Sequence, residues 1–165
     1  MIATTRIAGF VGATAVLIVG VLVYLFDRSA ADLAFIPSWW VFADGSPGLF
    51  GNLGYSLPSF AHTFSFAMVL CVLSSGWRWP AWAVCGSWCA VEASLELAQH
   101  QIVSRFVIDY LPAGLVDWPV LQNIPAYFQF GRFDPMDMAG IILGGVAAWL
   151  AIAATSEPGV QEKCP

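Results

Sequence analysis

One stretch of this chain, Ile7–Phe26, contains no charged residue and is long enough to cross a lipid bilayer. A transmembrane helix needs about 20 mostly apolar residues, and in hydrocarbon the backbone must satisfy its own hydrogen bonds. The stretch exceeds the roughly 7 to 15 apolar residues of a signal peptide, and Asp27 and Arg28 follow it as an interfacial stop. We therefore predict that it is retained as a membrane-spanning helix.

The rest of the chain is apolar enough to supply further spans. Hydrophobic residues make up 59% of the sequence and charged residues only 10%, which no ordinary soluble domain of this length shows. The further candidates are Leu57–Ser75, Pro80–Gln99 and Met138–Thr155. We predict an all-α, polytopic membrane protein whose residues 1–155 form one four-helix transmembrane bundle, with residues 156–165 as a short polar tail.

The connections between the predicted spans are unequal in length. Asp27–Ser56 and His100–Asp137 are long, whereas the link at residues 76–79 is a tight turn, so a four-span protein places both long links on one face. Each face has three basic residues: Arg6, Arg78 and Lys163 lie opposite the long links, and the long links contain Arg28, Arg105 and Arg132. Loop length decides the orientation, because the positive-inside bias is read on short segments close to the span ends. We expect a bacterial inner-membrane protein with both termini in the cytoplasm and both long links outside.

The long links contain apolar runs, Leu33–Phe42 and Phe106–Phe130, and the second is interrupted by Pro112, Pro119 and Pro125. Prolines at that density end helices. These runs are predicted to be short interfacial or re-entrant segments over the outer leaflet, where they could roof a site.

Two glutamates, Glu92 and Glu96, lie one helical turn apart in the third predicted span. Carboxylates inside a membrane span are costly, so such a pair indicates a functional site. Together with Gln99 and His100 they follow spacings of three and four, which predicts one polar stripe. Two close carboxylates in a low dielectric do not both ionise comfortably, which favours a proton or a neighbouring cation.

Polar groups from three separate segments are predicted to meet near the outer face. At 1.5 Å per residue, His62 lies about 6 Å below Pro58, Glu96 lies one turn below Gln99, and Arg132 just precedes the fourth span. Arg132 can bind a carboxylate through two hydrogen bonds, and His62 can donate to the other. The structural alternative is that this network only ties helix ends together.

A metal site is a further alternative, because histidine and carboxylate side chains are competent ligands. The sequence has no compact metal motif such as His-Glu-x-x-His, and we expect neither a metal nor a cofactor. The candidate ligands are His62, Glu92, Glu96, His100, Asp134 and Asp137.

Small residues recur along the fourth predicted span at Gly140, Gly144 and Ala148. Spacing by four places them on one strip, which allows helix backbones to approach closely. We predict a helix contact within the bundle at this strip.

Short motifs in the second half of the chain resemble the VanZ-like membrane proteins. They are His62, the run Glu96-Leu-Ala-Gln99, and the run Gly131–Gly140 leading into Gly144. The resemblance covers roughly Pro58–Trp149. It implies a membrane protein of the bacterial cell envelope, and the family's founding member is associated with resistance to the glycopeptide teicoplanin.

Two classes of function follow from these residues. In the first, a membrane enzyme acts on an envelope lipid or lipid-linked substrate, with Glu96 or Glu92 as general acid or base, His62 as proton partner and Arg132 as anion clamp. In the second, a non-catalytic accessory protein uses the same polar cleft to bind a lipid or a partner membrane protein. The predicted substrate site also includes Gln99, Asp134 and Asp137.

Several other classes are disfavoured. The sequence lacks a glycine-rich phosphate loop and a Gly-x-Ser-x-Gly elbow, which disfavours nucleotide hydrolysis and α/β-hydrolase chemistry. A net charge of −5 with scattered basic residues argues against a nucleic-acid partner.

Overall fold

A computed structural model describes residues 2–27, 42, 48–51, 53–74, 79–112, 114, 117–118 and 121–155, the side chains of residues 2–6 excepted. The predicted tail at 156–165, most of the run Leu33–Phe42, and Arg78 lie outside the described residues. Six α-helices form the regular structure of the described part. They are α1 (Ile2–Asp27), α2 (Leu53–Leu73), α3 (Ala81–Ala98), α4 (Gln101–Asp109), α5 (Ile124–Phe130) and α6 (Pro135–Thr155).

Three helices in the described part are long and apolar enough to cross a membrane, namely Ile7–Asp27, Leu53–Leu73 and Pro135–Thr155. This supports the predicted class, an all-α membrane-embedded protein. The third predicted span, Pro80–Gln99, corresponds to α3, which carries both glutamates and is not among these three helices, so three of the four predicted spans are supported.

The second predicted span begins earlier than expected. We predicted a start at Leu57, but α2 begins at Leu53 and contains Pro58 within the helix. A proline removes one backbone hydrogen bond and can bend a helix without ending it. As a result, His62 lies about 14 Å along the helix axis from Leu53 at 1.5 Å per residue, deeper than the sequence suggested.

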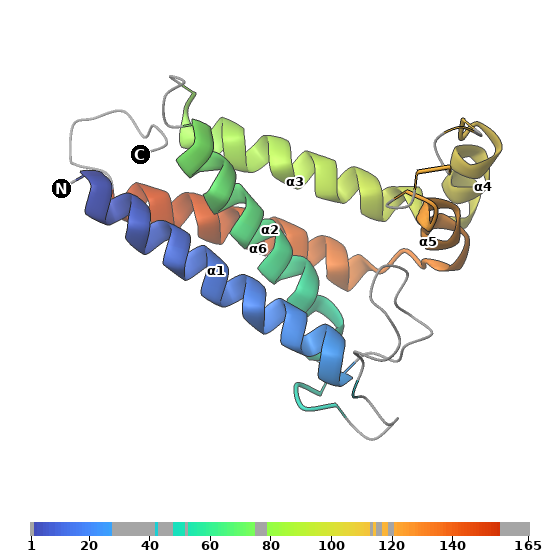
Figure 1. The fold of residues 1–165 in the computed structure, drawn as a ribbon, viewed down its shortest axis with the longest axis horizontal. Helices are drawn as coiled ribbons and strands as arrows, with labels where there is room; N and C mark the ends of the chain where they lie inside the picture. The colour runs from blue at the N-terminus through green and yellow to red at the C-terminus, as the bar shows by residue number, and fades with distance from the viewer. Residues whose placement is uncertain are drawn as a thin grey trace.

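The four long helices run side by side, and α4 and α5 lie together at one end of them (Figure 1). Helix α2 packs against α1, α6 and α3, and α3 also packs against α6. The start of α1, the end of α6 and the junction of α2 with α3 share the opposite end (Figure 1). The helix ends that the two long links join therefore lie at the same end of the bundle (Figure 1). Which side of a membrane this end faces stays a prediction.

The closest helix contact is between α6 and α2. A Cβ atom at Gly140 would lie 2.8 Å from the Ser56 carbonyl oxygen, and one at Gly144 would lie 2.6 Å from the Phe60 carbonyl oxygen. Ala148 on the same strip is fully buried. The predicted small-residue contact within the bundle is confirmed, and it depends on these two glycines lacking a side chain.

Gly144→Ala tests this close contact. Alanine normally favours a helix over glycine by about 1 kcal/mol, but here its methyl group would meet the α2 backbone, and overpacking costs about 1–3 kcal/mol. We expect the variant to be less stable than the parent when unfolding in SDS is followed by circular dichroism. Gly86→Ala on α3 is the control, because nothing lies within 4 Å of its Cβ position. Equal stability of the two variants would contradict the packing argument.

Candidate functional site

The Glu96 carboxylate is anchored at the end of the bundle where α3 ends and α6 begins. The residue is 8% exposed. Its Oε1 accepts a 2.7 Å hydrogen bond from the Asp134 backbone N–H, and its Oε2 accepts a 3.4 Å bond from Gln99 Nε2. Hydrogen bonds to both oxygens compensate for the cost of burying this group.

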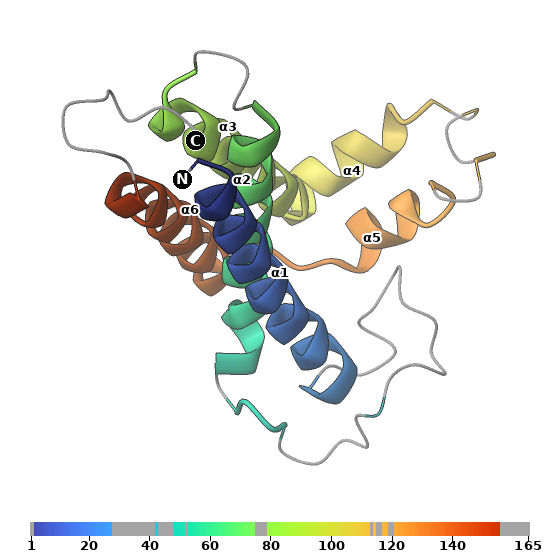
Figure 2. The ribbon, with the colours of Figure 1, turned by 60° about the vertical axis from the view of Figure 1, so that its left-hand side comes forward.

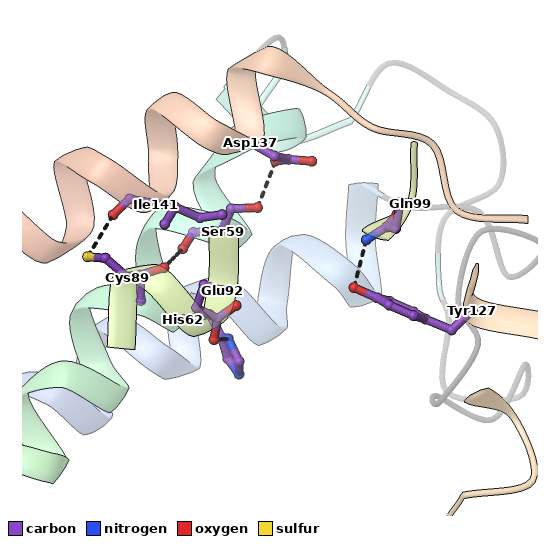
Figure 3. Close-up of polar contacts among 9 residues, drawn as sticks. Ser59, His62, Cys89, Glu92, Gln99, Tyr127, Asp137 and Ile141 are labelled. Atoms are coloured by element: carbon purple, nitrogen blue, oxygen red, sulfur yellow. Dashed lines mark hydrogen bonds and ion pairs between the residues drawn. The ribbon is translucent and has the colours of Figure 1, made fainter. Parts of the chain in front are cut away.

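Gln99 connects the same carboxylate to α5. Its Nε2 atom also donates to the Tyr127 hydroxyl at 2.6 Å (Figure 3). A Cβ atom at Gly131 would collide with the Gln99 side chain and the Tyr127 carbonyl oxygen, so the chain needs glycine there. Burial, and secondly the negative charge of Glu96, raises the pKa of the Tyr127 phenol to about 12.

Asp134 sets the start of α6. Its side-chain Oδ1 accepts a 2.8 Å bond from the Met136 N–H, and Pro135 occupies the first helical position. An N-cap aspartate followed by proline is a strong helix start, because proline lacks the N–H that would be unsatisfied there. This cap directs the Asp134 N–H toward Glu96 while fixing where Asp137 falls on the helix.

Asp137 joins α6 to α2. Its Oδ1 accepts a 2.7 Å hydrogen bond from the Ser59 hydroxyl (Figure 3). This contact lies one turn from Gly140, where the two backbones approach closely.

A second carboxylate contact lies one turn deeper, between His62 on α2 and Glu92 on α3. His62 Nδ1 is 2.7 Å from Glu92 Oε1, and the two side chains are 47% and 13% exposed, respectively. Figure 3 shows this pair apart from the contact of Ser59 with Asp137. Unlike Glu96, the pair therefore presents a titratable ring to the surroundings of the bundle.

Aromatic rings border the His62–Glu92 pair. The His62 ring centroid is 4.4 Å from that of Phe66, and Phe66 stacks on Trp88 at 5.3 Å. The Trp88 Nε1 atom is buried and has no hydrogen-bond partner among the described residues. The imidazole thus lies on an apolar aromatic wall that also contains a donor without an acceptor.

Arg132 and His100 are placed differently from the prediction. Both side chains are exposed, and Arg132 makes no ion pair with a carboxylate in the described part of the chain. Helix α3 ends at Ala98 and the backbone is extended at His100, so the polar stripe ends at Gln99, and the His100 ring lies beside Phe133. Amide donors, rather than the predicted guanidinium, contact the Glu96 carboxylate.

The described residues contain no cluster of three or more histidine, cysteine, aspartate or glutamate side chains placed to hold a metal ion. The candidate ligands instead contact different partners, His62 pairing with Glu92 and Asp137 with Ser59. The geometry therefore gives no support to the metal alternative.

Two residues that take part in these polar contacts, Ser59 and Tyr127, were not predicted as site residues. Ser59 precedes His62 by three residues, so helical spacing would have placed it near the same face. Tyr127 lies in the long second link, and no local pattern indicates that it reaches Gln99. We use the name polar layer for Ser59, His62, Glu92, Glu96, Gln99, Tyr127, Asp134 and Asp137.

No protein-family model matches this chain, and neither the curated proteins nor the solved structures include a significant match. The resemblance to VanZ-like proteins accordingly stays a prediction. The functional argument rests on the geometry of the polar layer.

Glu96→Ala tests the anchoring role of this carboxylate. The substitution leaves the Asp134 N–H without its acceptor, and an unsatisfied buried donor costs about 1–3 kcal/mol. We expect lower stability in SDS unfolding, with a smaller loss for Glu96→Gln, which keeps a carbonyl acceptor. Asp109→Ala, at an exposed carboxylate, is the control. A Glu96→Ala protein as stable as the parent would show that the anchor contributes nothing.

The raised pKa of Tyr127 predicts a change at high pH. Because the folded protein favours the neutral phenol, this stabilisation is complete below pH 10 and is lost as the pH rises through about 12. A phenolate absorbance titration should contain a step near pH 12 that Tyr127→Phe lacks. Tyr110→Phe is the control and should keep that step. Its persistence in Tyr127→Phe would contradict the assignment.

Proposed function

We propose that this chain is a four-span protein of the bacterial inner membrane that binds an envelope lipid or lipid-linked substrate and acts on it through His62 and Glu92. The single observation that supports this most is the 2.7 Å contact of a half-exposed imidazole with an almost buried carboxylate, between two apolar helices. Ionisable groups at such depth are costly and mark functional sites by default.

We count α3 as a membrane span in addition to α1, α2 and α6. Its 18 residues extend about 27 Å at 1.5 Å per residue, close to the hydrocarbon thickness of a bilayer. It packs against α2 and α6, and its two glutamates turn toward the bundle. Trp79 and Trp82 are exposed where it begins, as expected at a membrane interface. Inward-facing acids allow an otherwise apolar helix to lie in lipid.

The His62–Glu92 pair has the arrangement of an acid–base dyad. Glu92 Oε1 lies 2.7 Å from Nδ1 as an ion pair, although this buried oxygen accepts no hydrogen bond of regular geometry from the described residues. The described residues provide Nε2 with no partner, so Nε2 is left to take or give a proton. The aromatic wall of Phe66 and Trp88 suits the apolar part of a lipid.

Glu96 and Arg132 take different roles in this proposal. Both oxygens of Glu96 accept hydrogen bonds, so in this proposal it positions α6. Arg132 is exposed beside that anchor and without an ion pair among the described residues, which suits it to hold a phosphate or carboxylate of the substrate. Gln99, Asp134 and Asp137 keep that end of the bundle in place.

Orientation and envelope context come from the sequence. The positive-inside pattern places the end that carries both termini in the cytoplasm, and therefore places the polar layer at the outer leaflet. The resemblance to VanZ-like proteins supports a substrate of the cell envelope and a link to teicoplanin resistance.

Variants of the dyad test this function in nanodiscs prepared from bacterial envelope lipid. We expect the parent protein to retain one lipid class and convert part of it to a product of different mass. Glu92→Gln and His62→Asn should lower the conversion by about 10²–10⁴-fold, the usual contribution of general acid–base catalysis. Arg132→Ala should instead weaken retention by about 10- to 100-fold, since a hydrogen bond to a charged group contributes about 1.5–3 kcal/mol. Lipid mass spectrometry measures both quantities.

Ser94→Ala is the matched control, because this exposed hydroxyl on α3 only bonds the Ala90 carbonyl oxygen of its own helix. It should behave as the parent. Retention without conversion, equal in the parent and in Glu92→Gln, would replace the enzyme with the accessory role. A lipid profile identical to that of empty nanodiscs would reject both.

A further inference from the structure

Helix α4 directs its apolar side chains outward. Ile102, Phe106 and Tyr110 are 77%, 62% and 73% exposed, and the rings of Phe106 and Tyr110 pack together with centroids 4.5 Å apart. Spacings of four place the three side chains on one face. We call these three residues the α4 apolar face.

One polar residue of α4, Ser104, is buried on the side away from this face, whereas Gln101, Arg105 and Asp109 are exposed. Ser104 is 8% exposed, while α4 packs against α5 and the end of α3. In water an amphipathic helix buries its apolar side and exposes its polar side. The exposure of three large side chains on the α4 apolar face therefore indicates that the surroundings of this face are themselves apolar.

The lipid-facing surface of the bundle continues into this face. Val91 and Leu95 are exposed on α3, and only Gln99 and His100 separate α3 from α4. Figure 2 shows α4 leaving the bundle sideways, with α5 beside it, rather than extending α3. A helix that departs laterally at the end of a span lies at the level where hydrocarbon meets headgroups.

We propose that α4 lies in the plane of the membrane interface, with the α4 apolar face inserted among the acyl chains of the phospholipids. Arg105 and Asp109 are exposed as well and, three residues after Ile102 and Phe106, border one edge of the apolar face, where they reach the headgroups. This inference requires only that the protein is embedded in a membrane. It does not depend on His62, Glu92 or any reaction.

The consequence concerns the polar layer. Helix α5 packs against α4, and Tyr127 of α5 contacts Gln99. If α4 marks the headgroup boundary, Gln99 and Glu96 lie at that boundary and the His62–Glu92 pair lies about one turn inside it. A ligand of the polar layer then arrives sideways from the leaflet rather than from bulk water.

Photo-crosslinking of the full chain tests this placement. The amino acid p-benzoylphenylalanine replaces Ile102, Phe106, Arg105 or Asp109, one at a time, and each protein is placed in nanodiscs of radiolabelled phosphatidylethanolamine and phosphatidylglycerol. We expect several-fold more labelled lipid on the protein at positions 102 and 106 than at 105 and 109. Only protein that elutes from size exclusion as a single peak is irradiated. If the variant at position 102 or 106 fails this criterion, p-benzoylphenylalanine is placed at Tyr110 instead.

Equal labelling at all four positions would overturn the proposal. So would a crosslink from position 102 or 106 to another protein, since a second copy of the chain or a partner would then cover the face. Loss of turnover in Glu92→Gln leaves the labelling pattern unchanged, so failure here and failure of the proposed reaction can be told apart.

Discussion

The approach of α6 to α2 at Gly140 and Gly144 is the constraint on which the polar layer depends. Without side chains at these positions, the backbones of the two helices come into contact over more than one turn. That contact fixes the rotation of α6, and therefore brings Asp137, one turn earlier, against Ser59. Immediately before the helix, Asp134 then presents its N–H to Glu96. The steric contact of α6 with α2 thus determines which polar groups of α6 and its preceding segment reach α2 and α3.

The run Gly131–Gly140 concentrates these functions in a short segment. Gly131 leaves room for the Gln99 side chain, Asp134 caps the helix, and Asp137 bonds Ser59. Each role requires its residue type for a stated physical reason: absence of Cβ, an acceptor for an early N–H, and an acceptor beside a hydroxyl. The segment was singled out in the sequence through a family resemblance, and the geometry now gives it an explanation that needs no resemblance.

Local and periodic features could be predicted, and features that depend on tertiary contacts could not. The span at Ile7–Phe26 and the small-residue strip follow from uninterrupted apolarity and from spacing by four. The start of α2 was wrong by four residues because Pro58 lies inside a helix. The backbone partner of Glu96 was missed because a backbone N–H carries no sequence signal. Arg132 was predicted as the partner instead because its side chain is a cation. Tyr127 reaches Gln99 across 28 residues, and no local pattern indicates such a contact.

The two glutamates of α3 have different surroundings, and we propose different roles for them. Glu96 accepts hydrogen bonds at both oxygens, which hold its side chain against the start of α6. Glu92, one turn deeper, contacts a ring that is itself half-exposed to the surroundings of the bundle. A half-exposed ion pair contributes little to stability, so the packing of α2 on α3 gains little from this contact. The exposed imidazole is therefore better explained by a ligand that approaches it than by the packing of α2 on α3.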